Sequence, residues 1–299
     1  MENLILILLC ISFGYLISKL KVFSKDAATT LNQFAIYISL PSIILLQIPK
    51  LNFTMEAIIP IIIAWVVMTI SAVLVLLSSK YFNFSKEVTG ALMLVAVLTN
   101  SSFLGIPIIS TYLGDSSLPY ILIYDQFGTF IAFSIYGTFI ASFYANKKEI
   151  SFKLIFYKIV TFPPFMALIA GLLLMGTEFN KITTDILKIF ANTTIPVTLV
   201  AVGLQLQFKL PKEDIKPFSV ALAIKLFIAP LIAIVICEIF SWHNEAAMVS
   251  ILEAGMSPMI TAGAIAAMVG LAPRLSSAIV GYGILISLLS SFILHKIII

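Results

Sequence analysis

The feature that most constrains this chain is a succession of apolar segments of about 20 residues, separated by short polar joints. A helix of that length spans the roughly 30 Å hydrocarbon core of a bilayer. Hydrophobic residues make up 61% of the 299 residues and charged residues 11%, whereas soluble domains have about 25% charged residues. This surplus of apolar surface excludes a water-soluble fold and predicts one integral membrane unit.

Ten segments are long enough to span a membrane when Pro and Gly interruptions are allowed. They are residues 3–20, 28–48, 57–79, 88–113, 118–144, 154–176, 183–207, 216–240, 245–270 and 275–297.

Basic residues orient these spans, because cytoplasmic joints carry the excess of Lys and Arg. One alternate set of joints holds Lys19, Lys21, Lys25, Lys80, Lys86, Lys147, Lys148, Lys153, Lys158, Lys209, Lys212, Lys216 and Arg274. The other set holds Lys50, Lys181, Lys188 and Lys296. The division of 13 against 4 predicts that both termini lie on the non-cytoplasmic side, in agreement with an even number of spans.

An internal repeat is indicated by prolines at a nearly constant offset: Pro41 and Pro196 differ by 155, and Pro107 and Pro258 by 151. We therefore predict two repeats, residues 1–150 and 151–299, with five transmembrane helices each. Since five is odd, the second repeat enters the membrane with the opposite orientation. Inverted repeats of this kind are typical of secondary transporters.

Polar and helix-breaking residues gather near the middle of the fourth span, about 20 Å beyond Glu87 along a helix. They are Thr99, Asn100, Ser101, Ser102, Gly105 and Pro107. The ninth span has a similar stretch around Glu253, and Ser257 and Pro258 there predict the N-cap and first residue of a new half-helix. Pro and Gly also merely kink membrane helices. Interruptions in both repeats favour a substrate site instead.

Three ionisable residues lie inside spans, where charge is costly and therefore indicates function. Glu253 is expected to bind Na⁺ or a proton, or to be a protonated packing residue. Lys225 is expected to neutralise an anionic substrate, or to form an ion pair with Glu253 or Asp125. Asp125 lies about a third of the way into its span, so an interfacial role facing water is an alternative to a place in the site.

No enzyme signature is present. His243 and His295 form no metal-binding pair, Cys10 and Cys237 have no metal-ligand spacing, and no nucleophile elbow, phosphate-binding loop or cofactor fingerprint occurs. We therefore expect neither catalysis nor a cofactor. Because a nucleotide-binding motif is missing, the energy for any active transport is expected to come from ion or substrate gradients.

Five segments resemble the auxin efflux carriers and their bacterial relatives described as malate or malonate permeases. They are FGYLISKL (13–20), FAIYISLPSIIL (34–45), TNSSFLGIPII (99–109), IPVTLVAVGLQL (195–206) and EAGMSPMITAGAIA (253–266). The resemblance implies a scaffold module from helices 1, 2, 6 and 7, often dimerising, and a transport module from helices 3–5 and 8–10. It also implies that the broken fourth and ninth helices cross in the transport module.

The resemblance likens Asn100 to the asparagine that contributes to anion binding at the crossing in plant members. Those members have a proline where this chain has Thr99, and a long central loop where this chain has a short joint, which disfavours auxin as the substrate. Thr99, Asn100 and Glu253 are also similar to residues that supply sodium ligands in the more distant bile acid sodium symporters. This similarity implies Na⁺ as a coupling ion.

We therefore predict a secondary transporter of a small organic anion, a carboxylate, which works by an elevator mechanism coupled to Na⁺ or H⁺. It is expected in the plasma membrane as a homodimer formed through the scaffold module, with no nucleic acid partner. The alternatives are an auxin-like uniporter or exporter, a ligand-binding membrane sensor and a channel. The short joints disfavour a sensor, and the inverted repeat disfavours a channel.

Overall fold

The computed structural model describes residues 2–24, 26–50, 55–144, 152–206, 208, 210 and 212–298. Every regular element in these residues is a helix, and the extended backbone pairing is limited to one isolated antiparallel bridge between Thr99 and Pro258. The prediction of an all-α protein is therefore confirmed for the described part of the chain.

Six of the described helices are long and apolar enough to cross a membrane. They are Ala27–Lys50, Met55–Tyr81, Asp115–Tyr144, Lys181–Gln205, Lys212–Ile239 and Pro273–Ile298. Shorter apolar helices, Ile5–Leu20, Ser101–Leu113 and Pro163–Leu173, fall in three other expected spans. A polytopic architecture is thus confirmed, while the count of ten spans stays a prediction.

The α-helices of the first half are α1 (Glu2–Leu20), α2 (Ala27–Phe34), α3 (Leu40–Gln47), α4 (Ile59–Tyr81), α5 (Lys86–Val95), α6 (Ile106–Leu113), α7 (Leu118–Ile123) and α8 (Thr138–Tyr144). Wider π-helical turns adjoin them at η1 (Ala35–Ser39), η4 (Ser101–Gly105), η6 (Tyr124–Phe130) and η7 (Phe133–Gly137). Short 3₁₀ turns are η2 (Ile48–Lys50), η3 (Met55–Ile58) and η5 (Asp115–Ser117).

The α-helices of the second half are α9 (Phe152–Val160), α10 (Pro163–Leu173), α11 (Lys181–Ala191), α12 (Thr194–Gln205), α13 (Ile215–Ala223), α14 (Ala229–Ile239), α15 (Glu245–Ala254), α16 (Ile260–Met268) and α17 (Pro273–Ile298). The 3₁₀ turn η8 (Lys212–Asp214) precedes α13, and the π-helical turn η9 (Ile224–Ile228) joins α13 to α14.

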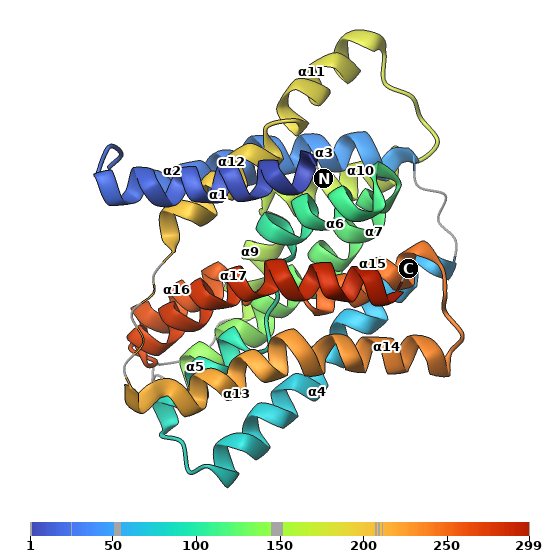
Figure 1. The fold of residues 1–299 in the computed structure, drawn as a ribbon. Helices are drawn as coiled ribbons and strands as arrows, with labels where there is room; N and C mark the ends of the chain where they lie inside the picture. The colour runs from blue at the N-terminus through green and yellow to red at the C-terminus, as the bar shows by residue number, and fades with distance from the viewer. Residues whose placement is uncertain are drawn as a thin grey trace.

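The helices pack in two groups (Figure 1). In the first group, α1 and α2 pack along α12, while α10 and α11 pack against α3. In the second group, α4, α5 and α13 to α17 pack on one another. Helix α6 lies between the groups, because it contacts α1 and α12 on one side and α15 on the other. The crossing described below is built by α5, α15 and α16 of the second group together with η4 and α6.

Close contact between α1 and α12 depends on glycine. A Cβ atom at Gly14 would overlap the carbonyl oxygen of Val200, and one at Gly203 would overlap that of Ile11. Small residues let membrane helices approach until their backbones touch, which strengthens van der Waals packing where no hydrophobic force drives helices together. The first group is therefore held by direct backbone packing between the two halves of the chain.

The sixth expected span, 154–176, is interrupted, which the sequence analysis does not predict. Helix α9 ends at Val160, and α10 starts at Pro163 after Phe162 takes an extended conformation with φ −74° and ψ 119°. Two consecutive prolines explain the break, because proline disfavours helical backbone in the residue before it and cannot donate a helical hydrogen bond.

The predicted boundary between repeats, at residues 150 and 151, lies outside the described residues. Of the basic residues used to orient the spans, Lys25, Lys147, Lys148 and Lys209 also lie outside them.

Candidate functional site

Two helices are interrupted where the sequence predicts breaks. Helix α5 ends at Val95, and regular helix resumes at Ser101; helix α15 ends at Ala254, and α16 begins at Ile260. Both interrupted helices start with a side-chain cap: the Ser85 side chain accepts from the backbone N–H of Val88, and the Asn244 side chain accepts from that of Ala247. The expected spans 88–113 and 245–270 are therefore both interrupted, as the sequence predicts.

The exact positions within these breaks differ from the prediction. Gly105 and Pro107 lie inside the resumed helix Ser101–Leu113 rather than at its break. Ser257 and Pro258 are not the N-cap and first residue of a half-helix, since Met259 is the N-cap of α16. Their backbone is extended because it pairs with the other interruption, and this pairing replaces the helical hydrogen bonds.

The two interruptions are paired with each other through their backbones. The N–H of Asn100 donates to the carbonyl oxygen of Ser257 at 2.9 Å, and the N–H of Met259 donates to that of Leu98 at 3.0 Å. The side-chain Nδ2 of Asn100 also lies 3.4 Å from the Ser257 hydroxyl. Unwound backbone at membrane depth needs such partners, since no water is available there. The pairing therefore places both breaks at one site.

Lys225 reaches this site from η9. Its side chain is 1% exposed, and its Nζ donates to the Thr99 hydroxyl at 2.5 Å and to the Ala254 carbonyl oxygen at 3.2 Å. It thus contacts one acceptor from each interruption. Within the described residues, its ammonium group lies more than 4.0 Å from the carboxyl oxygens of Glu253 and Asp125. The prediction of a direct ion pair with either residue is therefore wrong.

Asp125 is buried in η6 and anchors the helix that resumes after the first break. Its Oδ1 accepts hydrogen bonds from the hydroxyls of Ser101 and Ser102, each at 2.5 Å, and its Oδ2 accepts from Nε2 of Gln126 at 2.5 Å. With 2% of its surface exposed, Asp125 does not face water, and the alternative of an interfacial role is wrong.

Glu253 lies in the last turn of α15 and is fully buried. Neither of its carboxyl oxygens has a hydrogen-bond partner, and both lie against Gly105, where a Cβ atom would overlap them. Glycine at position 105 therefore makes room for this carboxyl group. Glu253 is the acidic side chain of the site that is least satisfied by its surroundings.

Tyr124 is a buried residue of this region that the sequence analysis misses. Its side chain is fully buried and its hydroxyl has no hydrogen-bond partner. A tyrosine within an apolar run gives no signal by itself, and only its position beside Asp125 could have drawn attention to it.

The residues implied as sodium ligands differ in what they contact. The Thr99 hydroxyl accepts from Lys225, and the amide Nδ2 of Asn100 lies 3.4 Å from the Ser257 hydroxyl. In the described part of the chain, no group of three or more His, Cys, Asp and Glu side chains could hold a metal ion. Both carboxyl oxygens of Glu253 are buried and have no hydrogen-bond partner.

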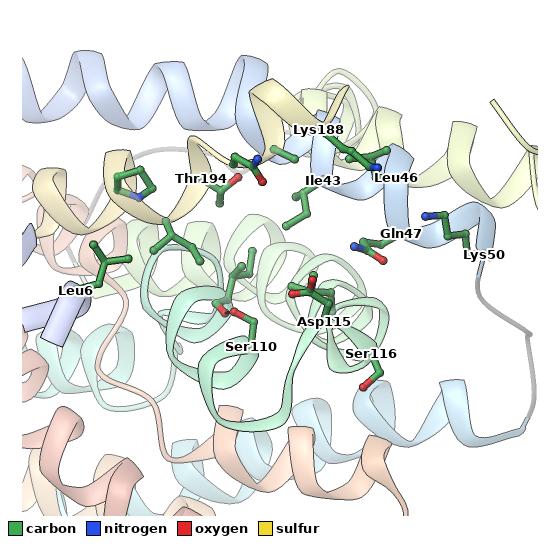
Figure 2. Close-up of a pocket in the computed structure, with 16 residues that line it drawn as sticks. Leu6, Ile43, Leu46, Gln47, Lys50, Ser110, Asp115, Ser116, Lys188 and Thr194 are labelled. Atoms are coloured by element: carbon green, nitrogen blue, oxygen red, sulfur yellow. Dashed lines mark hydrogen bonds between the residues drawn. The ribbon is translucent and has the colours of Figure 1, made fainter. Parts of the chain in front are cut away.

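A cavity of about 780 Å³ opens between α3, α11 and α12 on one side and α6, η5 and α7 on the other. Figure 2 shows Lys50, Lys188 and Gln47 around this cavity, with Ser110 on the opposite wall. Thr194 also lines it and has a buried hydroxyl without a partner. From the sequence, Lys50 and Lys188 count only as charges in joints between spans, and their shared place at this cavity is not foreseen.

Comparisons with known proteins find similarity over almost the whole chain. The family model described as "Membrane transport protein" matches residues 1–294. A protein of Methanothermobacter thermautotrophicus named "Uncharacterized transporter" is 24% identical over 269 residues, which is 89% of this chain and 87% of that protein. "Uncharacterized transporter MJ1031" of Methanocaldococcus jannaschii is 26% identical over 272 residues, 87% of each chain.

Proposed function

The chain belongs to the membrane transport protein family, as its resemblance to the auxin efflux carriers predicts, and we propose that it is a secondary transporter of a small organic anion. With its apolar helices, this membership makes it an integral, multi-pass membrane protein of a transporter family rather than an enzyme family. The substrate is a carboxylate, and the gradient of an ion or of the substrate drives its movement.

The observation that carries this proposal is the pairing of two interrupted helices at one site. Helix Ser101–Leu113 and α16 both begin there, and helix N-termini carry free N–H groups and a partial positive charge that favour anions. The ends of α5 and α15 carry the opposite partial charge, which favours cations. A crossing of this kind therefore suits an anion together with a positive charge.

Contacts between equivalent positions of the two halves support an inverted repeat of five helices each. The hydroxyls of Ser39 and Thr193, 154 residues apart, lie 2.7 Å from each other, and Asn100 and Ser257 are 157 residues apart. When two repeats are related by an approximate two-fold axis, a residue contacts its equivalent in the other repeat only if both lie near that axis. These separations match the proline offsets, so ten helices in two inverted repeats are part of the proposal.

Transport follows an elevator mechanism in which the module of helices 3–5 and 8–10 slides against the scaffold of helices 1, 2, 6 and 7. The packing of the helices in two groups supports this division. A second cavity, of about 260 Å³, is lined by Thr29 and Gln205 on one side and Ser277 on the other. Together with the larger cavity, it gives the boundary between the modules an opening near each end.

The protein resides in the plasma membrane, and both of its termini lie on the non-cytoplasmic side. Lys50 and Lys188 line the same cavity, which supports their assignment to one side of the membrane. The cavity then faces the non-cytoplasmic side, and its two ammonium groups attract anions to it. The scaffold helices α1 and α2 provide the surface for a homodimer.

The coupling ion is Na⁺ or H⁺, and the unpartnered carboxyl group of Glu253 is the residue that responds to it. When bound, such an ion would neutralise the carboxyl charge so that the module can cross the membrane interior. Replacing Glu253 with Gln is expected to abolish the dependence on the ion gradient while substrate exchange continues.

Exchange across proteoliposome membranes tests this function. Purified protein is reconstituted into vesicles that contain an unlabelled mono- or dicarboxylate. The same compound in labelled form is added outside, and its uptake into the vesicles is measured. We expect protein-dependent exchange of at least one carboxylate, lost in Asn100→Leu and retained in the control Asn83→Gly. Asn83 lies in the turn after α4, outside both interruptions, and glycine tolerates its positive φ of 54°. Exchange of only cations or neutral solutes would refute the proposal that the substrate is an anion. If no carboxylate raises the thermal unfolding midpoint, that result would count against the proposed site.

A further inference from the structure

The ammonium group of Lys225 occupies an unusual position for a lysine in a membrane protein. It is buried, with 1% of its side chain exposed, and lysines near helix ends instead extend to the interface. Lys225 sits in the middle of the span Lys212–Ile239. A group that costly is retained in the interior only where its partners and role require it.

The partners of this ammonium are the oxygens that a bound cation would use. The Ala254 carbonyl is at the C-terminal end of α15, where helix carbonyls lack internal partners and carry partial negative charge. The Thr99 hydroxyl belongs to the interruption that follows α5. Lys225 therefore bridges the two breaks in the way expected of a metal ion held between half-helices.

The buried charges of the site also fit a resident cation. Asp125 is satisfied by three hydrogen bonds from Ser101, Ser102 and Gln126. Glu253 has no hydrogen-bond partner, and the described charges that interact with it electrostatically are Asp125 and Lys225. Because Lys225 is the positive member of this group, it supplies the compensating charge that an added ion would otherwise bring.

From these contacts, and resting on the proposed transport function, we propose that the Lys225 ammonium is a tethered cation in place of a coupling sodium ion. Of the two coupling ions proposed above, only H⁺ then remains, and substrate binding and exchange need no Na⁺. A sodium ion that used the Thr99 hydroxyl would lie beside the ammonium group that already donates to it. A second monovalent cation about 4 Å from the ammonium would bind roughly a thousandfold more weakly than without it, at an effective dielectric constant of about 20.

The first test uses the unmodified protein. Its thermal unfolding midpoint is measured across a titration of NaCl against choline chloride at constant ionic strength, and carboxylate exchange is measured in both salts. We expect the same midpoint and an exchange rate that changes less than about twofold. Saturable stabilisation by Na⁺, or exchange at least about tenfold faster in Na⁺, would overturn the proposal.

The second test removes the tethered charge with Lys225→Ala and uses Lys212→Ala, an exposed lysine of the same span, as the matched control. We expect Lys225→Ala to lose at least about tenfold in exchange, and methylammonium or Na⁺ to raise its unfolding midpoint and restore part of the exchange. Lys212→Ala should show neither effect. If Lys225→Ala folds but neither cation stabilises it more than choline does, the position is not a cation site.

These outcomes separate the inference from the proposed function. If no carboxylate is exchanged by the unmodified protein, the transport proposal fails, yet the sodium titration of unfolding still decides whether Na⁺ binds. If Lys225→Ala does not fold, the same titration on the unmodified protein decides the question alone.

Discussion

The hydrogen bonds around Asp125 make a prediction that can be worked through from the structure. Replacing Asp125 with Leu, which has the same number and branching of side-chain heavy atoms, removes the acceptor of three donors: the buried Ser101 hydroxyl and Gln126 amide and the half-buried Ser102 hydroxyl. Leaving a buried donor unsatisfied costs about 1–3 kcal/mol. Since the two hydroxyls can rotate towards other acceptors, we expect a total loss near the low end, about 3–4 kcal/mol.

Asp125→Asn should cost much less, about 1 kcal/mol, because its oxygen can still accept from both serines. The new asparagine side chain would place its own NH₂ group, a donor, against Nε2 of Gln126, which donates to Oδ2 of Asp125 in the unmodified protein. A flip of the Gln126 amide resolves this conflict, because Oε1 of Gln126 is buried and has no partner. The predicted difference between the Asn and Leu variants is therefore about 2–3 kcal/mol.

Equilibrium unfolding in mixed detergent micelles measures these free energies. The double variant Asp125→Asn with Gln126→Leu isolates the amide flip, because the flip predicts a coupling of about 1 kcal/mol between the two positions. Equal destabilisation by Asn and Leu would refute the role of the retained oxygen. A Leu variant as stable as the unmodified protein would show that the three hydrogen bonds do not hold the resumed helix.

Three further changes test other parts of the structure. Gly14→Ala should destabilise the protein by about 1–3 kcal/mol in the same unfolding assay, because the new methyl group meets backbone that cannot move aside; an unchanged stability would contradict backbone contact between α1 and α12. Gly105→Ala should push the Glu253 carboxyl group away and lower exchange at least about tenfold, with no further loss when Glu253→Ala is already present. The double change Lys50→Glu with Lys188→Glu should slow carboxylate uptake at least about tenfold at low salt and less at high salt, because screening weakens steering by the cavity's charges; a loss independent of salt would argue for a structural effect.

Much of the fold follows from local properties of the chain. Long apolar segments must be helical in a bilayer, since only helices and closed barrels satisfy every backbone hydrogen bond there. Proline has no backbone N–H to donate, so a proline inside a span, such as Pro258, marks a place where the helical hydrogen bonds are interrupted. The consecutive prolines after Phe162 mark the third break by the same local rule, although no polar residues accompany them.

Partners within the site could not be read in the same way. Sequence distance along a span leaves a water-facing role open for Asp125, whereas Asp125 is buried and accepts from the serines of the resumed helix. Lys225 is buried too, and its partners are a hydroxyl and a carbonyl rather than a carboxylate. Lys50 and Lys188 were assigned to one side, and packing of α3 against α11 brings them to one cavity.

The sequence alone determined that the chain is a helical membrane protein with two interrupted helices, because hydrophobic length and backbone-breaking residues act locally. Only the tertiary structure decided that the interruptions pair with each other, that Ser257 and Pro258 are extended, and that Lys225 joins both breaks. The reason is that a buried polar group takes whichever partner the packing brings within hydrogen-bonding distance, and residues more than a hundred positions apart carry no local signal of that proximity.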